Sequence, residues 1–165
     1  MIAGIRNGLG DYMRRSILLI LCIFALPSIA APFTDNGDGT VTDSATSLVW
    51  QQCSSGLSGS SCSTGTATTY TWQNALSYCN TLSLSSKSWR VPSINELKSI
   101  IDRSRVAPSI SITFFPEASS STANWSSTTD INSGSGNAWG VSFADGSVTS
   151  SVKSGTLKAR CVAGP

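Results

Sequence analysis

The cysteines constrain the fold of this chain more than any other feature. Of the five, four lie beyond residue 50, at Cys53, Cys62, Cys79 and Cys161. In a chain that reaches an oxidising compartment, an even number of cysteines indicates two disulfide bonds, for which three pairings exist. We favour Cys53–Cys62, which closes a Ser/Gly-rich loop, and Cys79–Cys161, which joins a predicted helix to the last predicted strand. On a chain-entropy model these bonds stabilise by roughly 3 and 4.5 kcal/mol.

The first residues of the chain have the order of a secretory signal. Arg14 and Arg15 form a basic region, and an apolar run follows over residues 17–26. Ser28-Ile29-Ala30 then supplies small residues at the positions that signal peptidases inspect. A membrane-spanning helix needs about 20 apolar residues, and this run is shorter. The pattern therefore predicts export rather than a membrane span.

These features predict a signal peptide over residues 1–30 and one mature domain over residues 31–165. Met13 gives a better-proportioned signal than Met1 and is the alternative start. The leader holds three of the eleven basic residues and one of the nine acidic ones, which leaves eight of each in the mature chain. Such a balance provides no field for a polyanion, so nucleic acid is not expected as a partner.

The apolar pattern of the mature chain predicts an α+β fold. Two helices are expected, one capped by Thr71 and one opened by Ser93 with Glu96 as its capping box. The residues between Ser54 and Thr69 are almost all Ser, Thr and Gly and predict an exposed loop. Short strands of one antiparallel sheet are expected over residues 33–42, 47–51, 139–143, 147–152 and 158–162.

Seven sequence blocks in one order resemble a known family. They resemble the C-terminal domain of the Legionella collagen-like adhesin, and together they cover the chain from Phe33 to Val162. The blocks are Phe33–Asp43, Leu48–Gln51, Thr71–Ala75, Trp89–Leu97, Trp125–Thr128, Trp139–Gly146 and Arg160–Val162. The resemblance implies a C-type-lectin-like fold in exported or surface proteins of bacteria, and a role in binding sulfated polysaccharides and in attachment.

The tryptophans of these blocks are predicted to be framework residues. Trp50, Trp89, Trp125 and Trp139 could stack on sugar rings, but tryptophans also bury large areas in small cores. Their position within framework blocks favours core packing. Arg160, in the last block, is expected to be a framework hydrogen-bond donor.

The sequence gives little support for a metal site or an enzyme. In a calcium-loop alignment of the segment around Asp38, the first and twelfth ligand positions hold Thr34 and Ala45, neither of which is acidic. The chain has no histidine, the commonest general base. Glu117 and Asp130 could form a glycosidase pair, but nothing in the sequence brings them together. We expect no metal, no cofactor and no catalysis.

Four cations are the candidate ligand-binding residues for an anionic polysaccharide. Arg103 and Arg105 follow the second predicted helix, and Lys153 and Lys158 flank the turn before the last predicted strand. Arginine and lysine bind sulfates through charge-assisted contacts.

The expected function is that of an exported, lectin-like polysaccharide-binding module without a calcium sugar site. The alternative is a non-catalytic structural or assembly subunit that binds envelope proteins. Either would be secreted, periplasmic or at the bacterial cell surface, and oligomerisation is compatible with both.

The processing prediction is tested by the mass of the exported protein. Cleavage after Ala30 should give a product that starts at Ala31, because the small residues precede that bond. Intact-mass measurement of exported material checks this, and a product that retains Arg14 and Arg15 would contradict it.

Overall fold

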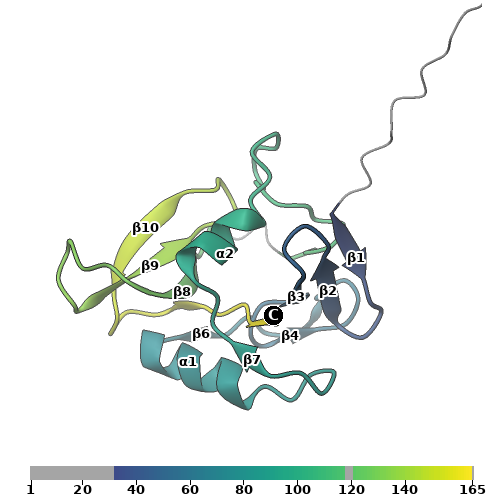
Figure 1. Cartoon of the computed structure of the whole chain (residues 1–165), viewed down its shortest axis with the longest axis horizontal. Coiled ribbons are helices and arrows are strands. Elements are labelled where there is room, and N and C mark those ends of the chain that lie inside the picture. The colour runs from purple at the N-terminus through teal and green to yellow at the C-terminus, as the bar shows by residue number, and fades with distance from the viewer. Residues whose placement is uncertain (1–31, 118–120, 165) are drawn as a thin grey trace, which may run out of the picture. The chain divides into compact units, whose positions relative to one another are not determined.

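Two helices and twelve short strands are found in residues 32–117 and 121–164, which are the residues that the computed structural model describes (Figure 1). The α+β class is as predicted, and the predicted signal peptide lies outside the described residues. The helices are α1 (Trp72–Thr81) and α2 (Ile94–Ser99). The strands are β1 (Phe33–Asp35), β2 (Thr40–Asp43), β3 (Leu48–Gln51), β4 (Leu57–Ser58), β5 (Thr64–Gly65), β6 (Thr69–Tyr70), β7 (Trp89–Arg90), β8 (Asn124–Thr129), β9 (Asn137–Val141), β10 (Val148–Val152), β11 (Leu157–Lys158) and β12 (Val162–Ala163).

The strands form two five-stranded sheets instead of the single antiparallel sheet that was predicted. The first has the order β1-β2-β3-β12-β7 and the second β10-β9-β8-β11-β6, while β4 and β5 pair separately. Every pair is antiparallel except β8 with β11. The β1–β2 hairpin turns where expected, and Gly37 and Gly39 adopt positive φ angles of 73° and 83° that glycine accepts without strain.

Both helices begin at the predicted caps. The Thr71 hydroxyl accepts a hydrogen bond from the backbone N–H of Asn74 at 3.4 Å. At α2 the capping box is complete. The Ser93 hydroxyl accepts a hydrogen bond from the backbone N–H of Glu96, and the Glu96 carboxylate accepts one from the backbone N–H of Ser93. Arg90 also donates two hydrogen bonds to Glu96, and this contact lowers the pKa of Glu96 to about 2 despite partial burial.

Each helix covers one of two hydrophobic clusters. Leu97 from α2 and Ile100 after it pack in the cluster around Trp50, while Ala75 and Cys79 from α1 pack in the cluster around Trp89 and Trp125. Ile100 lies just past the end of α2 and is still only 2% exposed. Strand β12 contributes to both clusters, through Val162 to the first and Ala163 to the second.

Three of the four predicted framework tryptophans are buried. Trp50, Trp89 and Trp125 are at most 4% exposed. Trp139 differs, because it lies in β9 with partial exposure and belongs to neither cluster. Its prediction as a core residue is wrong. On β9 the alternate positions Ala138 and Gly140 are buried instead, and strand geometry sends neighbouring side chains to opposite faces.

The predicted single strand over residues 158–162 is also wrong. The chain leaves the second sheet after Lys158 and enters the first sheet at Val162. Between them, Ala159 N–H donates to Ser55 Oγ at 3.2 Å and Arg160 turns its side chain into the protein. The crossing also accepts two backbone bonds, from Ser55 N–H to Ala159 O and from Gln51 N–H to Cys161 O, both at 2.9 Å. Side-chain and backbone bonds therefore hold it together where the regular strand pairing is interrupted.

The two predicted disulfides are confirmed. Cys53–Cys62 closes a separation of 9 residues and Cys79–Cys161 one of 82. The long bond ties α1 to the crossing segment, where both sulfurs belong to the cluster of Trp89 and Trp125. No helix within the described residues is long and apolar enough to span a membrane.

Removal of the long disulfide should cost more stability than removal of the short one. Replacing Cys79 and Cys161 by Ser should lower the free energy of unfolding by about 4–5 kcal/mol, against about 3 kcal/mol for Cys53 and Cys62, since the longer loop restricts the unfolded chain more. Urea denaturation of the exported protein measures both. An equal loss would contradict the entropic explanation.

Candidate functional site

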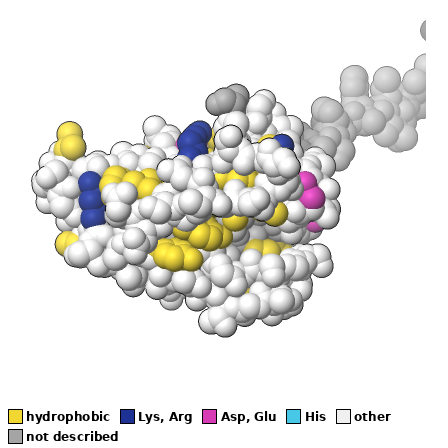
Figure 2. All heavy atoms as spheres, turned by 90° about the horizontal axis from the view of Figure 1, so that it is seen from below, with side chains coloured by type: hydrophobic (Ala, Val, Ile, Leu, Met, Phe, Trp, Pro, Cys, Tyr) yellow, Lys and Arg dark blue, Asp and Glu magenta, His cyan; other side chains and the backbone are white. Residues whose placement is uncertain are grey.

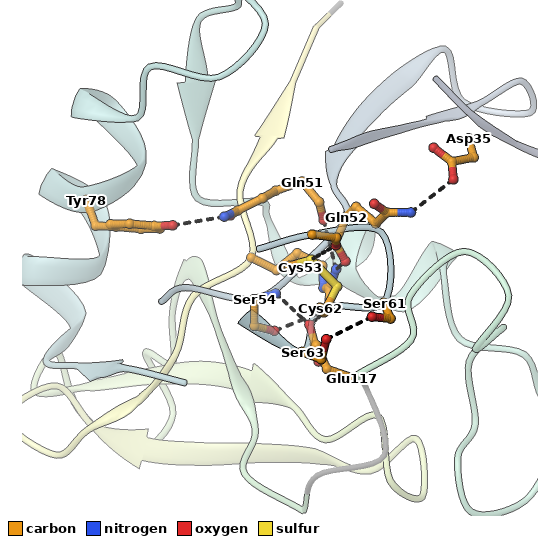
Figure 3. Close-up of a disulfide and its surroundings, with 12 residues drawn as sticks. Asp35, Gln51, Gln52, Cys53, Ser54, Ser61, Cys62, Ser63, Tyr78 and Glu117 are labelled. Atoms are coloured by element: carbon orange, nitrogen blue, oxygen red, sulfur yellow. Dashed lines mark hydrogen bonds and ion pairs between the residues drawn. A yellow bond between two sulfur atoms is a disulfide. The ribbon is translucent and has the colours of Figure 1, made fainter. Parts of the chain in front are cut away.

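A groove of about 470 Å³ lies between the β1–β2 hairpin, the 53–62 loop and the end of α1. Its polar lining includes Asp35, Asp38, Gln51, Gln52 and Tyr78, and its apolar lining Leu57, Leu82 and Leu84. Three segments far apart in the sequence therefore form one surface, and Figure 3 shows the polar side chains of two of its walls.

The phenol of Tyr78 is held by an amide. Gln51 donates from Nε2 to the Tyr78 hydroxyl at 2.9 Å (Figure 3). Its side-chain oxygen Oε1 accepts from the backbone N–H of Cys161 at 3.2 Å. The ring of Tyr78 stacks on Tyr70 at 5.1 Å between centroids. Burial raises the pKa of Tyr78 above its ordinary value, at which a phenol is already protonated at neutral pH. Because the oxygen accepts from Gln51, the O–H remains available to donate to a ligand.

The opposite wall presents carboxylates. Gln52 donates to Asp35 Oδ2 at 3.2 Å, while the N–H of Gly37 donates to Oδ1 at 2.8 Å. Asp38 accepts from the Ser85 hydroxyl at 2.7 Å, and this bond, followed by that from Thr40, lowers the pKa of Asp38. Both carboxyl groups are exposed at the rim, where they can accept hydrogen bonds from hydroxyls.

Arg160 supports the groove from behind. Its guanidinium is fully buried and donates to the carbonyl oxygens of Gln51 and Gln52, to Ser54 Oγ at 3.2 Å and to the carboxylate of Glu117. The ring of Phe115 lies 4.8 Å from the guanidinium carbon. The predicted framework role of Arg160 is thus what the structure shows, and it fixes the backbone that carries both groove amides.

Glu117 is committed to this buried pair. Burial by itself raises the pKa of Glu117, but the charge of Arg160 and the bonds from Ser54 outweigh it, so the net pKa is lowered. A carboxyl group that stays ionised in this way is a poor general acid.

The segment after the first cysteine is less exposed than predicted. Ser54 and Ser55 are at most 1% exposed. The Ser55 hydroxyl donates to Thr68 O at 2.7 Å and accepts from Ala159 N–H. The rest of the segment folds as the β4–β5 hairpin, held by the Cys53–Cys62 bond, and forms the outer wall of the groove.

The four predicted cations lie elsewhere. Arg103 and Arg105 are exposed after α2. Lys153 donates to Thr129 Oγ1 at 2.9 Å, and its Nζ lies 4.2 Å from the centroid of the Trp72 ring. Lys158 is only 6% exposed, unlike the exposed position that polymer binding needs. The structure does not bring these residues to the groove.

Charged side chains are sparse on the face shown in Figure 2, where uncharged groups dominate. None of the described residues that line the groove is Lys or Arg, and no cluster of metal-ligating side chains is found within residues 32–117 and 121–164. The groove residues Gln51, Gln52 and Tyr78 were not predicted. The only sequence signal for them was that they lie in or beside two of the family-like blocks, Leu48–Gln51 and Thr71–Ala75.

The fold and its bonds define a disulfide-linked α+β domain with a polar, weakly acidic groove. A family model described as the Lcl C-terminal domain matches residues 39–163. The chain belongs to this adhesin-associated family, as the sequence blocks predicted. No curated protein matches the chain.

The buried ion pair should be far more sensitive to substitution than the exposed one. Glu117→Gln should cost about 3–5 kcal/mol of unfolding free energy, because the charge of Arg160 stays buried without a counter-charge. Arg90→Ala should cost at most about 1 kcal/mol, because its side chain is 44% exposed. Thermal or urea unfolding measures both, and comparable losses would contradict the supporting role of Arg160.

Proposed function

We propose that this chain is a non-catalytic, exported polysaccharide-binding domain and that its ligand occupies the groove. The family and the two disulfides support an extracellular role. The bond from α1 to the C-terminal segment supports the C-type-lectin-like fold that the sequence blocks imply. The observation that carries the proposal is a pair of side-chain amides held by hydrogen bonds in the groove. Gln51 donates to the Tyr78 hydroxyl, and Gln52 donates to the Asp35 carboxylate.

The chemistry of the groove suits a sugar. A pyranose presents hydroxyls that both donate and accept, together with small apolar patches. The groove offers the O–H of Tyr78 as a donor, carboxylate oxygens of Asp35 as acceptors, and leucines beside them. Because hydrogen bonds already hold these side chains, little conformational entropy is lost when a ligand binds. The volume is also in the range of small-ligand sites.

The charge of the groove favours a neutral polymer over a sulfated one. Two carboxylates line it and repel sulfate. A sulfated polymer, the ligand class implied by the sequence resemblance, would instead have to contact Arg103 and Arg105 outside the groove. The two ligand classes therefore predict different sets of sensitive residues.

The absence of catalysis is part of the proposal. Glu117, one of the two carboxylates considered for a glycosidase, is held by Arg160 and is 10% exposed. The alternative function, a structural subunit, is favoured by a separate feature, the open edge of β10.

The groove is tested with one variant that removes a single hydroxyl. Tyr78→Phe keeps the ring that stacks on Tyr70 but deletes the groove donor, and it should weaken binding of a neutral oligosaccharide about tenfold, the equivalent of one hydrogen bond of about 1.4 kcal/mol. Tyr70→Phe is the matched control, since Tyr70 does not line the groove. An array of neutral and sulfated oligosaccharides, followed by calorimetry on the strongest neutral ligand, provides the measurement.

Three results discriminate between the hypotheses. A loss with Tyr78→Phe and none with Tyr70→Phe supports the groove. Binding confined to sulfated glycans, and lost when Arg103 and Arg105 become Ala, contradicts it. Absence of any glycan signal favours the structural alternative.

A further inference from the structure

One edge of the second sheet is open. Strand β10 stands at the end of the order β10-β9-β8-β11-β6, and among the described residues it pairs only with β9 (Figure 1). An edge strand presents unpaired N–H and C=O groups to which another strand can bind. This feature is independent of the groove and of the function proposed for it.

The register identifies which backbone groups face outward. Ser142 N–H donates to Ser147 O at 2.9 Å and Lys153 N–H donates to Gly136 O at 2.8 Å, at the two ends of the β9–β10 pair. Hydrogen-bonded pairs alternate along an antiparallel ladder. Thr149 and Ser151 therefore bond to β9, and the N–H and C=O groups of Val148, Ser150 and Val152 point away from the sheet.

The side chains do not protect this edge. The strand reads Val-Thr-Ser-Ser-Val, without charge or proline, although natural edge strands are commonly protected by charged residues or proline. Val148 and Val152 are 40% and 57% exposed. The charge of the adjacent Lys153 does not protect the edge, because its amine donates a hydrogen bond to Thr129 and lies over the ring of Trp72.

The strand is complementary to itself. We propose that β10 pairs antiparallel with β10 of a second copy of the chain, about a two-fold axis at Ser150. In this register Val148 lies opposite Val152 of the second copy, Ser150 lies opposite its own counterpart, and each pair can exchange two backbone hydrogen bonds. The Val152 carbonyl already accepts from Gly155 N–H at 2.9 Å and has a second lone pair for this bond.

A second copy fits this edge better than an unrelated strand. The five residues have valine at both ends, so self-pairing gives two valine–valine contacts on one face, and such cross-strand pairs stabilise a sheet. Isologous contacts of this kind close as two-fold dimers, the commonest oligomers. The dimer would also join two grooves, and linked weak sites bind a polymer more tightly than either alone.

The register is tested by charge. For the exported protein, sedimentation velocity over a concentration series should show a reversible monomer–dimer equilibrium. The variant V148K/V152K places like charges opposite each other across the axis and should weaken the dimer at least about tenfold. The variant V148K/V152E places opposite charges there and should keep it. V106K, the same change at an 88% exposed valine elsewhere, is the control and should have no effect.

The axis is tested by cross-linking. Hydrogen-bonded residues opposite each other in antiparallel strands have Cα atoms about 5.5 Å apart, a separation that a disulfide spans. S150C should therefore form a covalent dimer under mild oxidation, visible on a non-reducing gel. S151C should not, because its counterpart lies about 7–8 Å away on the diagonal.

Each outcome decides the proposal. A dimer lost in V148K/V152K, kept in V148K/V152E and trapped by S150C supports it. A wild-type chain that stays monomeric at every concentration overturns it. A dimer that responds equally to both charge variants, or that cross-links equally at both positions, also overturns it. None of these results depends on glycan binding, so failure here is separate from failure of the groove.

Discussion

The arrangement of this protein depends on one buried charge. Arg160 is fully buried, and a buried arginine is costly unless its charge is paired and hydrogen bonds compensate for the lost water. Its charge is paired with the carboxylate of Glu117, and its two terminal nitrogens donate to the carbonyls of Gln51 and Gln52, to Ser54 Oγ and to that carboxylate. Of its nitrogens, only Nε has no hydrogen-bond partner among the described residues. The guanidinium therefore links three parts of the chain, which are the C-terminal segment, the end of β3 and Glu117.

The segment around Arg160 also explains how the two small sheets and their two hydrophobic clusters are joined. Residues 157–163 run from β11 in the second sheet to β12, which lies between β3 and β7 in the first sheet. Cys161 bonds to α1 and Val162 packs under α2. One short crossing thus contacts both helices and both sheets, and it does so with a disulfide, an ion pair and apolar side chains placed next to each other. A domain of this size has a modest core, and covalent and ionic links of this kind add stability where burial alone is limited.

The two surfaces with proposed roles differ in how they are built. In the groove, the amides and carboxylates are already paired within the protein. Arg160 holds the backbone behind it, and the Cys53–Cys62 loop forms its outer wall. The edge of β10 differs, because the outward-facing backbone groups of this strand pair with no other strand among the described residues. A binding site that is individually weak and an edge that joins copies would act together, because avidity rises with the number of linked sites.

Local signals in the sequence determined the parts of the fold that depend on nearby residues. The caps at Thr71 and Ser93 and the glycine turn of the first hairpin act over a few residues, so their positions were predictable. The pairing of the cysteines was also predicted, because few pairings exist and loop composition favoured one. The family followed from the order of short blocks along the chain.

Only the tertiary structure decided what depends on contacts between distant residues. Lys158 and Trp139 carry no local signal of burial or exposure, and their environments are set by which strands lie beside β11 and β9. The same reason applies to the groove, whose walls come from three segments and whose amides were indistinguishable in sequence from framework residues. The closing segment could be recognised as β-rich, but its division between two sheets depends on bonds from Arg160 to carbonyls more than 100 residues away.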